Sequence, residues 1–317
     1  MTPNPAEPLY QVLKRIRRPL AVKDILASCL RHVYMGDPFK DGGIPEPPRE
    51  LFEGVLTSEV QIGDLRCVIY SPPSSEIRPL LVYMHGGAFV VGCSEDVDYI
   101  ARRLCFDNSL TVISVNYRLA PEHMFPAALN DCFAVYDWAC SSAADLGIDR
   151  QRIYLAGDSA GANLAASLAL QLHKQAKDVQ GLIMLAPWLD MYVEQYDSFT
   201  RLAYDDVVVD APYLGFARAC YAKFADWANP LVSPQMAAIE DFPPTIAFGG
   251  SQDPLVDQVS AFAARAKDQG CKHIEAVIYQ GMPHCFYSFP NLFAEERDCF
   301  ARISRFLEGR ESLWSSS

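Results

Sequence analysis

The stretch "RIYLAGDSAGANLAASLALQLH", residues 152–173, decides the fold. It passes from an apolar run typical of a buried strand, through the compact sequence GDSAG, to a segment with helical periodicity. Gly157, Ala160 and Gly161 keep this joint small, as a close approach of strand and helix requires. Ser159 is therefore predicted either to attack a substrate from a sharp strand-to-helix turn or to cap the helix that follows.

The alternation of strand and helix continues on both sides of this stretch. Apolar strands are predicted at 60–70, 79–85, 110–117, 152–157, 181–187, 243–250 and 273–281, and helices at 95–107, 126–147, 160–176, 259–270 and 294–309. Strands that are apolar at nearly every position need helices on both faces of their sheet. The sequence therefore predicts an α/β fold with a mostly parallel, doubly wound sheet.

The alternation is missing in two segments. Residues 1–50 combine a helical pattern with a proline-rich end, which predicts a peripheral segment followed by a linker, and the family resemblance described below implies that it is an N-terminal cap segment. Residues 188–240 are rich in aromatic side chains and predict a helical cap insertion over the carboxyl edge of the sheet, between the core segments 51–187 and 241–317. Whether these rings line a ligand pocket or pack only against one another stays open at this level.

The charge balance narrows the choice of partners. A net charge of −12 and a pI near 4.9 disfavour a nucleic-acid partner. The basic N-terminal stretch "KRIRRPLAVKDILASCL" is interrupted by Lys23 and Asp24, so it resembles neither a signal peptide nor a membrane span. We expect a cytoplasmic protein without stable membrane insertion.

The 10 cysteines are scattered through the chain, mostly in apolar segments. No two of them are spaced as CxxC, so reduced, buried thiols are expected and no metal site is predicted. This thiol usage also agrees with a cytoplasmic location.

A serine nucleophile needs a histidine base and an acid that orients it. Of the 6 histidines, His284 is the best placed, because it lies just past the last predicted strand and so at the sheet edge of Ser159. Asp253 follows the preceding strand and is the predicted acid, with Asp257 as the weaker alternative. Asp253 could instead be the N-cap of the next helix.

Backbone donors for a tetrahedral oxyanion are predicted in "YMHGGAF". Gly86 and Gly87 follow a strand and carry no side chain that would block their amides. With the amide of Ala160 they form the predicted oxyanion hole. The chain order Ser159, Asp253, His284 is the order found in α/β-hydrolases.

Five motifs together resemble the hormone-sensitive-lipase-like family of α/β-hydrolases: HGGA at 85–88, YRLAPEHMFPAAL at 117–129, GDSAG at 157–161, DPL at 253–255 and HCF at 284–286. The resemblance runs from about residue 50 to the C-terminus. It implies an α/β-hydrolase fold with a helical cap, and hydrolysis of short-chain carboxylic esters without a cofactor. It also implies Ser159, Asp253 and His284 as the catalytic residues, with Gly86, Gly87 and Ala160 as the oxyanion hole.

The chain departs from the family pattern at three positions. Ala88 stands where the last glycine of HGGG is usual, Met124 replaces a proline, and Ser251 stands where many relatives carry glutamate. These changes bear on supporting structure more than on chemistry. Around the second motif we expect a charged structural network of Arg118, Glu122 and Asp131.

The predicted function is that of a serine carboxylesterase that acts on small ester molecules through an acyl-enzyme. The alternatives are an amidase or deacetylase with the same triad, and a non-catalytic small-molecule-binding protein on the same fold. A homodimer is compatible with the resemblance, since some relatives pair through the last strand and helix. If His284 is the base, kcat/KM is expected to rise with pH through roughly 6 to 7.

Overall fold

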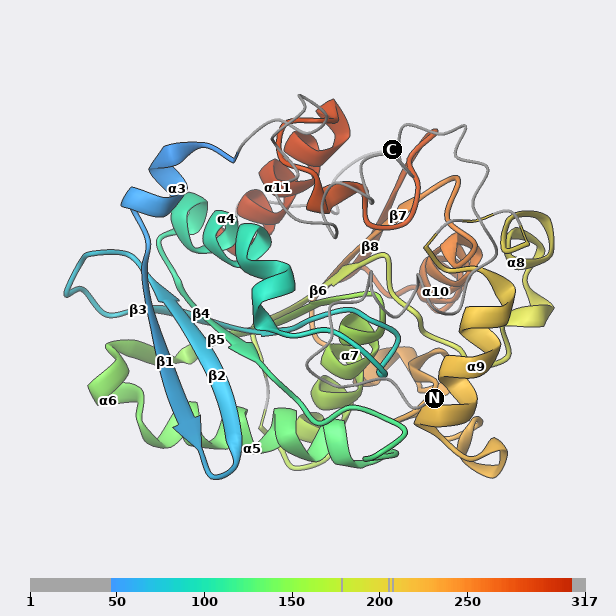
Figure 1. The fold of residues 1–317 in the computed structure, drawn as a ribbon, viewed down its shortest axis with the longest axis horizontal. Coiled ribbons are helices and arrows are strands. Elements are labelled where there is room, and N and C mark those ends of the chain that lie inside the picture. The colour runs from blue at the N-terminus through green and yellow to red at the C-terminus, as the bar shows by residue number, and fades with distance from the viewer. Residues whose placement is uncertain (1–46, 178, 205, 207, 310–317) are drawn as a thin grey trace.

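An eight-stranded sheet organises the protein. The computed structural model describes residues 47–177, 179–204, 206 and 208–309, and its strands lie in the order β1-β2-β4-β3-β5-β6-β7-β8 (Figure 1). The strands are β1 (Leu56–Ile62), β2 (Leu65–Ser71), β3 (Arg78–Met84), β4 (Thr111–Val115), β5 (Ile148–Asp158), β6 (Gly181–Leu185), β7 (Thr245–Gly250) and β8 (Ile274–Tyr279). Strand β2 is antiparallel to β1 and to β4, and the remaining pairs are parallel. The predicted mostly parallel α/β sheet is confirmed.

The first predicted strand, 60–70, is wrong because it contains a turn. Gly63 adopts a left-handed φ of 59°, and the chain reverses there so that Ile62 pairs with Leu65 in an antiparallel hairpin. Glycine adopts this backbone without steric penalty. Strand β1 is largely exposed, so the apolar pattern that marks the buried strands is weak in it.

The helices of the structure match most of the predicted ones. They are α3 (Arg49–Glu53), α4 (Asp98–Asn108), α5 (Ala127–Ser141), α6 (Ala143–Leu146), α7 (Ala160–His173), α8 (Asp197–Leu202), α9 (Ala211–Tyr221), α10 (Val256–Asp268) and α11 (Ala294–Leu307), with short 3-10 turns η1 (Ser94–Val97), η2 (Val193–Gln195), η3 (Phe224–Asp226), η4 (Pro234–Met236), η5 (Ile239–Asp241) and η6 (Phe286–Ser288). The single helix predicted at 126–147 is two helices, which meet at Ser142.

Helices cover both faces of the sheet (Figure 1). Alternate residues of β3 show this: Leu80, Val82 and Met84 belong to the core shared with α5, α7 and α10, whereas Leu81 and Tyr83 belong to the core shared with α4 and α11. Successive side chains of a strand point to opposite faces, so a strand buried on both faces is apolar throughout. This explains the continuous apolar runs in the sequence.

The segment between β6 and β7 contains α8, α9 and the turns η2 to η5. Its aromatic side chains mostly pack against one another or into the core. Trp188 and Tyr221 are fully buried, and the rings of Tyr192, Phe224 and Trp227 meet edge-on, with centroids 5.7 Å apart for Tyr192 and Trp227 and 4.9 Å apart for Phe224 and Trp227. The question left open by the sequence is thus answered mainly in favour of packing. The predicted N-terminal segment 1–50 lies almost entirely outside the described residues.

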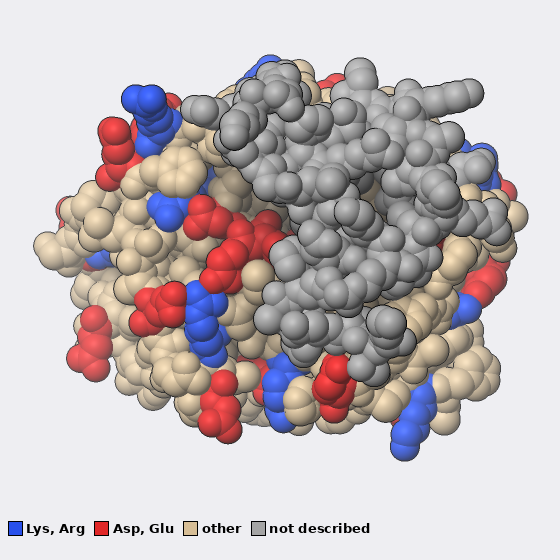
Figure 2. All heavy atoms as spheres, in the orientation of Figure 1, with Lys and Arg blue, Asp and Glu red and all other residues tan. Residues whose placement is uncertain are grey.

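Figure 2 shows acidic side chains gathered near the middle of one face, while lysines and arginines are scattered singly. This surface agrees with the net charge of −12. Among the described residues, no helix is long and apolar enough to cross a bilayer.

Candidate active site

Ser159 occupies the turn between β5 and α7 in a strained backbone conformation. Its φ is 52° and its ψ is −117°, a region that residues with a side chain rarely adopt. Its amide donates to the carbonyl of Leu185 on the neighbouring strand at 2.8 Å, and α7 begins at the next residue. No side-chain hydrogen bond from Ser159 caps the helix. The geometry therefore disfavours the capping role and suits a nucleophile held at a strand-to-helix turn.

Two glycines make this turn sterically possible. A Cβ on Gly161 would lie 2.0 Å from the carbonyl oxygen of Met84, and one on Gly157 would lie 2.4 Å from the carbonyl of Gly161. Both obstacles are backbone atoms, which cannot turn aside as a side chain can. The GxSxG spacing follows from this close approach of β3, β5 and α7.

His284 and Asp253 form a buried pair in the loops that follow β8 and β7. Nδ1 of His284 lies 2.8 Å from Oδ2 of Asp253, and both side chains are at most 1% exposed. Oδ1 of Asp253 accepts the amide of Leu255 at 2.8 Å. The N-cap of α10 is Leu255, so Asp253 is not the cap that the sequence left as an alternative. Its carboxylate instead orients the imidazole.

Asp257, the alternative acid, faces elsewhere. Its Oδ2 accepts the amide of Ser198 at 2.7 Å, which ties α10 to α8. Asp257 therefore joins the core to the segment between β6 and β7 and makes no contact with His284.

The pKa of His284 is set by two opposing effects. Burial disfavours the charged ring, but the adjacent Asp253 carboxylate stabilises it, and the net pKa lies well above the ordinary value of 6.5. The opposite holds for His85, whose burial lowers the pKa to about 4. Of these two buried rings, only that of His284 has a carboxylate that accepts a hydrogen bond from its Nδ1–H.

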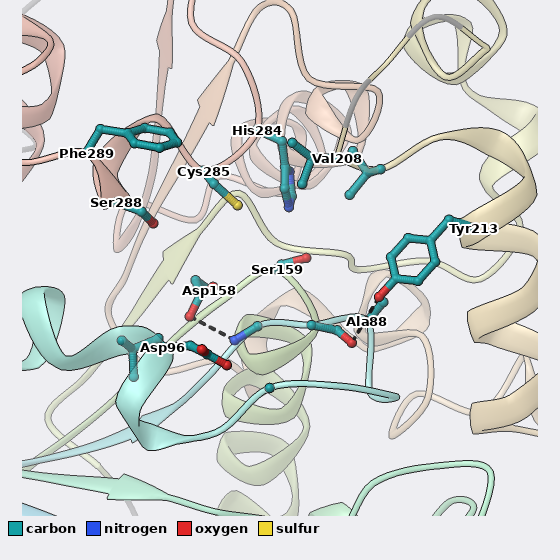
Figure 3. A pocket seen from close by; sticks show the side chains of 15 residues that line it. Ala88, Asp96, Asp158, Ser159, Val208, Tyr213, His284, Cys285, Ser288 and Phe289 are labelled. Carbon is teal, nitrogen blue, oxygen red and sulfur yellow. Dashed lines mark hydrogen bonds between the residues drawn. The ribbon is translucent and has the colours of Figure 1, made fainter. Parts of the chain in front are cut away.

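Ser159, His284 and Asp158 line one pocket, in which the hydroxyl of Ser159 and the ring of His284 face each other (Figure 3). No hydrogen bond joins Ser159 to His284 among the described contacts. Such contacts are often long without a substrate and shorten in the reacting complex. Because Nδ1 of His284 bonds to Asp253, Nε2 is the nitrogen left for the serine.

Asp158, the residue before Ser159, joins β5 to β3 and to the loop that follows β3. Its Oδ1 accepts the hydroxyl of Tyr83 at 2.9 Å and the amide of Gly86 at 3.0 Å. Burial raises the pKa of Asp158 to about 6. The Gly86 amide, one of the three predicted oxyanion donors, is thus already occupied. Gly87 and Ala160 remain, and Ala160 as the first residue of α7 has no intrahelical acceptor.

His85 stabilises the loop that follows β3. The Nδ1 of His85 lies 2.7 Å from the carbonyl of Gly86, and its ring stacks on Tyr117 with centroids 4.2 Å apart. The Tyr117 hydroxyl donates to the carbonyl of His85 at 2.7 Å. These contacts fix the backbone that presents Gly86 and Gly87.

The structure defines the local setting of two of the three departures from the family pattern, Ala88 and Ser251. Ala88 has a φ of 54°, a left-handed conformation in which glycine is less strained. The hydroxyl of Ser251 accepts the amide of Gly281 at 2.8 Å and so links the loops after β7 and β8.

The predicted charged network is only partly correct. Arg118 Nη2 and Nε pair with Asp131 at 2.7 and 2.9 Å, and Asp131 also accepts the Arg118 amide at 2.8 Å. Glu122 is exposed and makes no ion pair with Arg118 in the described chain. Asp131 helps to anchor this loop, because its carboxylate is buried beside the backbone amide it binds.

The pocket encloses about 80 Å³. Of the aromatic residues between β6 and β7, Tyr213 lines it, together with the valines Val208 and Val209. Among the described residues, the other aromatic side chains of this segment therefore do not line this pocket. Within the described ranges, no cluster of three histidine, cysteine or acidic side chains is arranged to hold a metal ion.

Residues 81–288 match the protein family described as the alpha/beta hydrolase fold. The arylesterase of Saccharolobus solfataricus is 33% identical over 225 residues, which cover 70% of this chain and 72% of the relative. The ethyl acetate hydrolase of Pseudomonas putida is 31% identical over 241 residues, which cover 72% and 73%. Among solved structures, a hyperthermophilic esterase from the archaeon Pyrobaculum calidifontis has a TM-score of 0.77 at 28% identity and covers 98% of this chain and 94% of its own.

Proposed function

The chain belongs to the α/β hydrolase fold family and is a carboxylic ester hydrolase, and on this premise we propose that it cleaves short-chain acyl esters through an acyl-enzyme on Ser159. The observation that carries this proposal is the buried His284–Asp253 pair, which faces the pocket that Ser159 enters from its strained turn. The three side chains come from loops after β5, β7 and β8 at one sheet edge.

In the acylation step, Oγ of Ser159 attacks the ester carbonyl carbon and its proton passes to Nε2 of His284. The carbonyl oxygen becomes an oxyanion, to which the amides of Gly87 and Ala160 donate. Loss of one such donor typically lowers turnover by about 10²- to 10³-fold. Collapse of the intermediate breaks the bond to the alcohol oxygen, which leaves with the proton from His284.

Deacylation repeats these steps with water. His284 removes a proton from water, the hydroxide attacks the acyl carbon, and the proton returns to Oγ of Ser159 as the acid leaves. Asp253 keeps the imidazole in the productive tautomer and stabilises its cationic form throughout. We propose no cofactor in this cycle.

The size of the pocket supports a preference for short acyl chains. Its volume of about 80 Å³ leaves little room beside the reacting carbonyl for a long acyl chain. The similarity to the ethyl acetate hydrolase of Pseudomonas putida supports the same preference for small esters. Butyrate esters are expected to be cleaved faster than decanoate esters, and the reverse order would contradict this preference.

The central test compares p-nitrophenyl acetate turnover by the wild-type protein and by Ser159→Ala. The substitution removes the attacking oxygen, so kcat should fall by about 10⁶-fold while folding is preserved. A fluorophosphonate should label the wild type once, at Ser159. An unlabelled and inactive wild type would overturn the proposed chemistry.

We further propose that residues 188–240 act as a cap over the site, because Val208, Val209 and Tyr213 from this segment line the pocket.

A cytoplasmic location is supported by the free thiols of the nine cysteines within the described residues. A homodimer through β8 and α11 is supported by the position of β8 at one edge of the sheet. Cell fractionation and light scattering on the purified protein test the last two proposals.

A further inference from the structure

The two sides of the pocket differ in chemistry. Ala88, Val208 and Tyr213 lie on one side of Ser159, and the polar side chains of Asp96 and Ser288 lie on the other, next to Cys285 and Phe289 (Figure 3). A simple aliphatic ester has no group that would use an acidic side chain in its pocket. The polar side therefore calls for an explanation beyond ester cleavage itself.

The two carboxylates on the polar side are not equivalent. Asp158 is only 6% exposed, and its Oδ1 is occupied by Tyr83 and Gly86. It is an internal link that holds the loop after β3, so it is not the group that meets a substrate.

Asp96, in η1, is exposed toward the pocket (Figure 3). Its Oδ2 accepts the amide of Cys93 at 3.0 Å and the thiol of Cys93 at 3.6 Å. No described residue donates to its Oδ1 or forms an ion pair with it. The adjacent Glu95 faces away from the pocket and pairs with Arg66 at 2.5 Å.

The surroundings of Asp96 favour a donor from a ligand. The pKa of Asp96 is raised above its ordinary value, because the protein around the carboxylate displaces part of the water that would solvate its charge. A hydrogen-bond donor that reaches Oδ1 would restore part of this lost solvation, whereas a second anion would be repelled. An apolar group at the same place would leave Oδ1 of Asp96 without a hydrogen-bond donor.

We propose that Asp96 is a specificity-determining residue, which accepts a hydrogen bond from a hydroxyl or ammonium group carried by the ester substrate. The preferred substrate is then a small ester with a donor on one part and an apolar group on the other. This proposal rests on the proposed esterase function and adds to it the chemical class of the substrate.

The test uses two pairs of isosteric esters that differ by CH₃ against OH. Propyl acetate and 2-hydroxyethyl acetate place the change on the alcohol, and ethyl butanoate and ethyl 3-hydroxypropanoate place it on the acyl chain. In at least one pair, the wild type should prefer the hydroxyl ester in kcat/KM by about 10- to 100-fold, the value of one charge-assisted hydrogen bond. The responding pair identifies the part of the ester that lies against Asp96.

Asp96→Asn should reduce this preference at least fivefold, and Asp96→Ala should abolish it. The anionic ester monoethyl succinate should be a poor substrate of the wild type and a better one of Asp96→Asn, a gain that misfolding cannot produce. Glu95→Gln is the matched control, because it removes a neighbouring charge outside the pocket and should leave every ratio unchanged.

Three outcomes would overturn the proposal. Equal kcat/KM values within both pairs would overturn the proposed role of Asp96, and so would a preference that survives in Asp96→Ala. If the wild type still cleaves p-nitrophenyl acetate in these cases, the proposed esterase function is unaffected. A preference lost equally in Glu95→Gln would assign the effect to overall charge. A wild type inactive on p-nitrophenyl acetate as well would overturn the proposed function, and this inference with it.

Discussion

The loops that follow β3 and β8 each carry a buried histidine at the same edge of the sheet. His85 and His284 are both 1% exposed, and both line or support the pocket of Ser159. Their environments are nevertheless opposite. His284 has a carboxylate at 2.8 Å, whereas His85 stacks on a tyrosine and binds a backbone carbonyl.

This difference teaches that burial alone does not create a base. Without a carboxylate, burial holds the His85 ring neutral, with a pKa of about 4, and suits it to a fixed structural role. His284 is equally buried, but the Asp253 carboxylate raises its pKa, so this ring can accept and hold a proton. The predictions below test this division between a reacting and a supporting histidine.

The largest effect is expected for His284→Ala. Removal of the base should lower kcat by about 10⁵- to 10⁶-fold, because Ser159 then has no acceptor for its proton. Steady-state turnover of p-nitrophenyl acetate measures the loss, and circular dichroism checks the fold. A loss of less than about 100-fold would argue that another group is the base.

Asp253→Asn should lower kcat by about 10³- to 10⁴-fold, since the amide no longer selects the productive tautomer of His284. The remaining activity should also show its acid limb at lower pH than the wild type, because the charge that raises the pKa of His284 is gone. Asp257→Asn serves as the control and should keep the wild-type limb.

His85→Ala should have a smaller effect, about 10- to 100-fold on kcat. It removes the stacking on Tyr117 and the contact with Gly86, so the donor at Gly87 loses its alignment. The pH profile of the variant should keep its shape, because His85 does not titrate in the active range. A shifted limb would show that His85 takes part in proton transfer.

The wild-type pH profile tests the same distinction without a mutation. His284 must be neutral to act as a base, so kcat/KM should rise about tenfold per pH unit toward a midpoint above 6.5. The range of roughly 6 to 7 expected from the sequence alone is that of an unperturbed imidazole and takes no account of this raised pKa. A midpoint below 6.5 would contradict the strong coupling of His284 to Asp253.

The smallest effect on activity is expected for Asp131→Asn, which acts beneath the His85 loop. Loss of the charged pair with Arg118 should lower the free energy of unfolding by about 1 to 3 kcal/mol. Chemical denaturation measures this change, and kcat should fall less than in His85→Ala. Glu122→Gln, outside the network, should leave the stability unchanged.

Several features of the site could be predicted from the sequence. The spacing of Gly157, Ser159 and Gly161 reports local steric limits, and the apolar strands report burial on two faces, so both are visible in the order of residues. The positions of Asp253 and His284 followed from the rule that parallel strands end at one sheet edge.

Other features escaped prediction because they depend on contacts between distant segments. Asp158 and Gly86 are 72 residues apart in the chain, and neither motif contains a pattern that predicts their hydrogen bond. The aromatic residues between β6 and β7 are equally consistent with a pocket lining and with a packed layer until their neighbours are known. The turn at Gly63 was missed because the exposed β1 lacks the pattern of a buried strand.

The sequence by itself determined the sheet, the strained turn at Ser159 and the order of the reacting residues, since these follow from backbone sterics and from local patterns of polarity. Only the tertiary structure decided which carboxylate serves which partner: Asp253 orients His284, Asp158 occupies the Gly86 amide, and Asp96 faces the pocket. The physical reason is that a carboxylate acquires its role from the donors and charges that packing brings within about 3 Å of it.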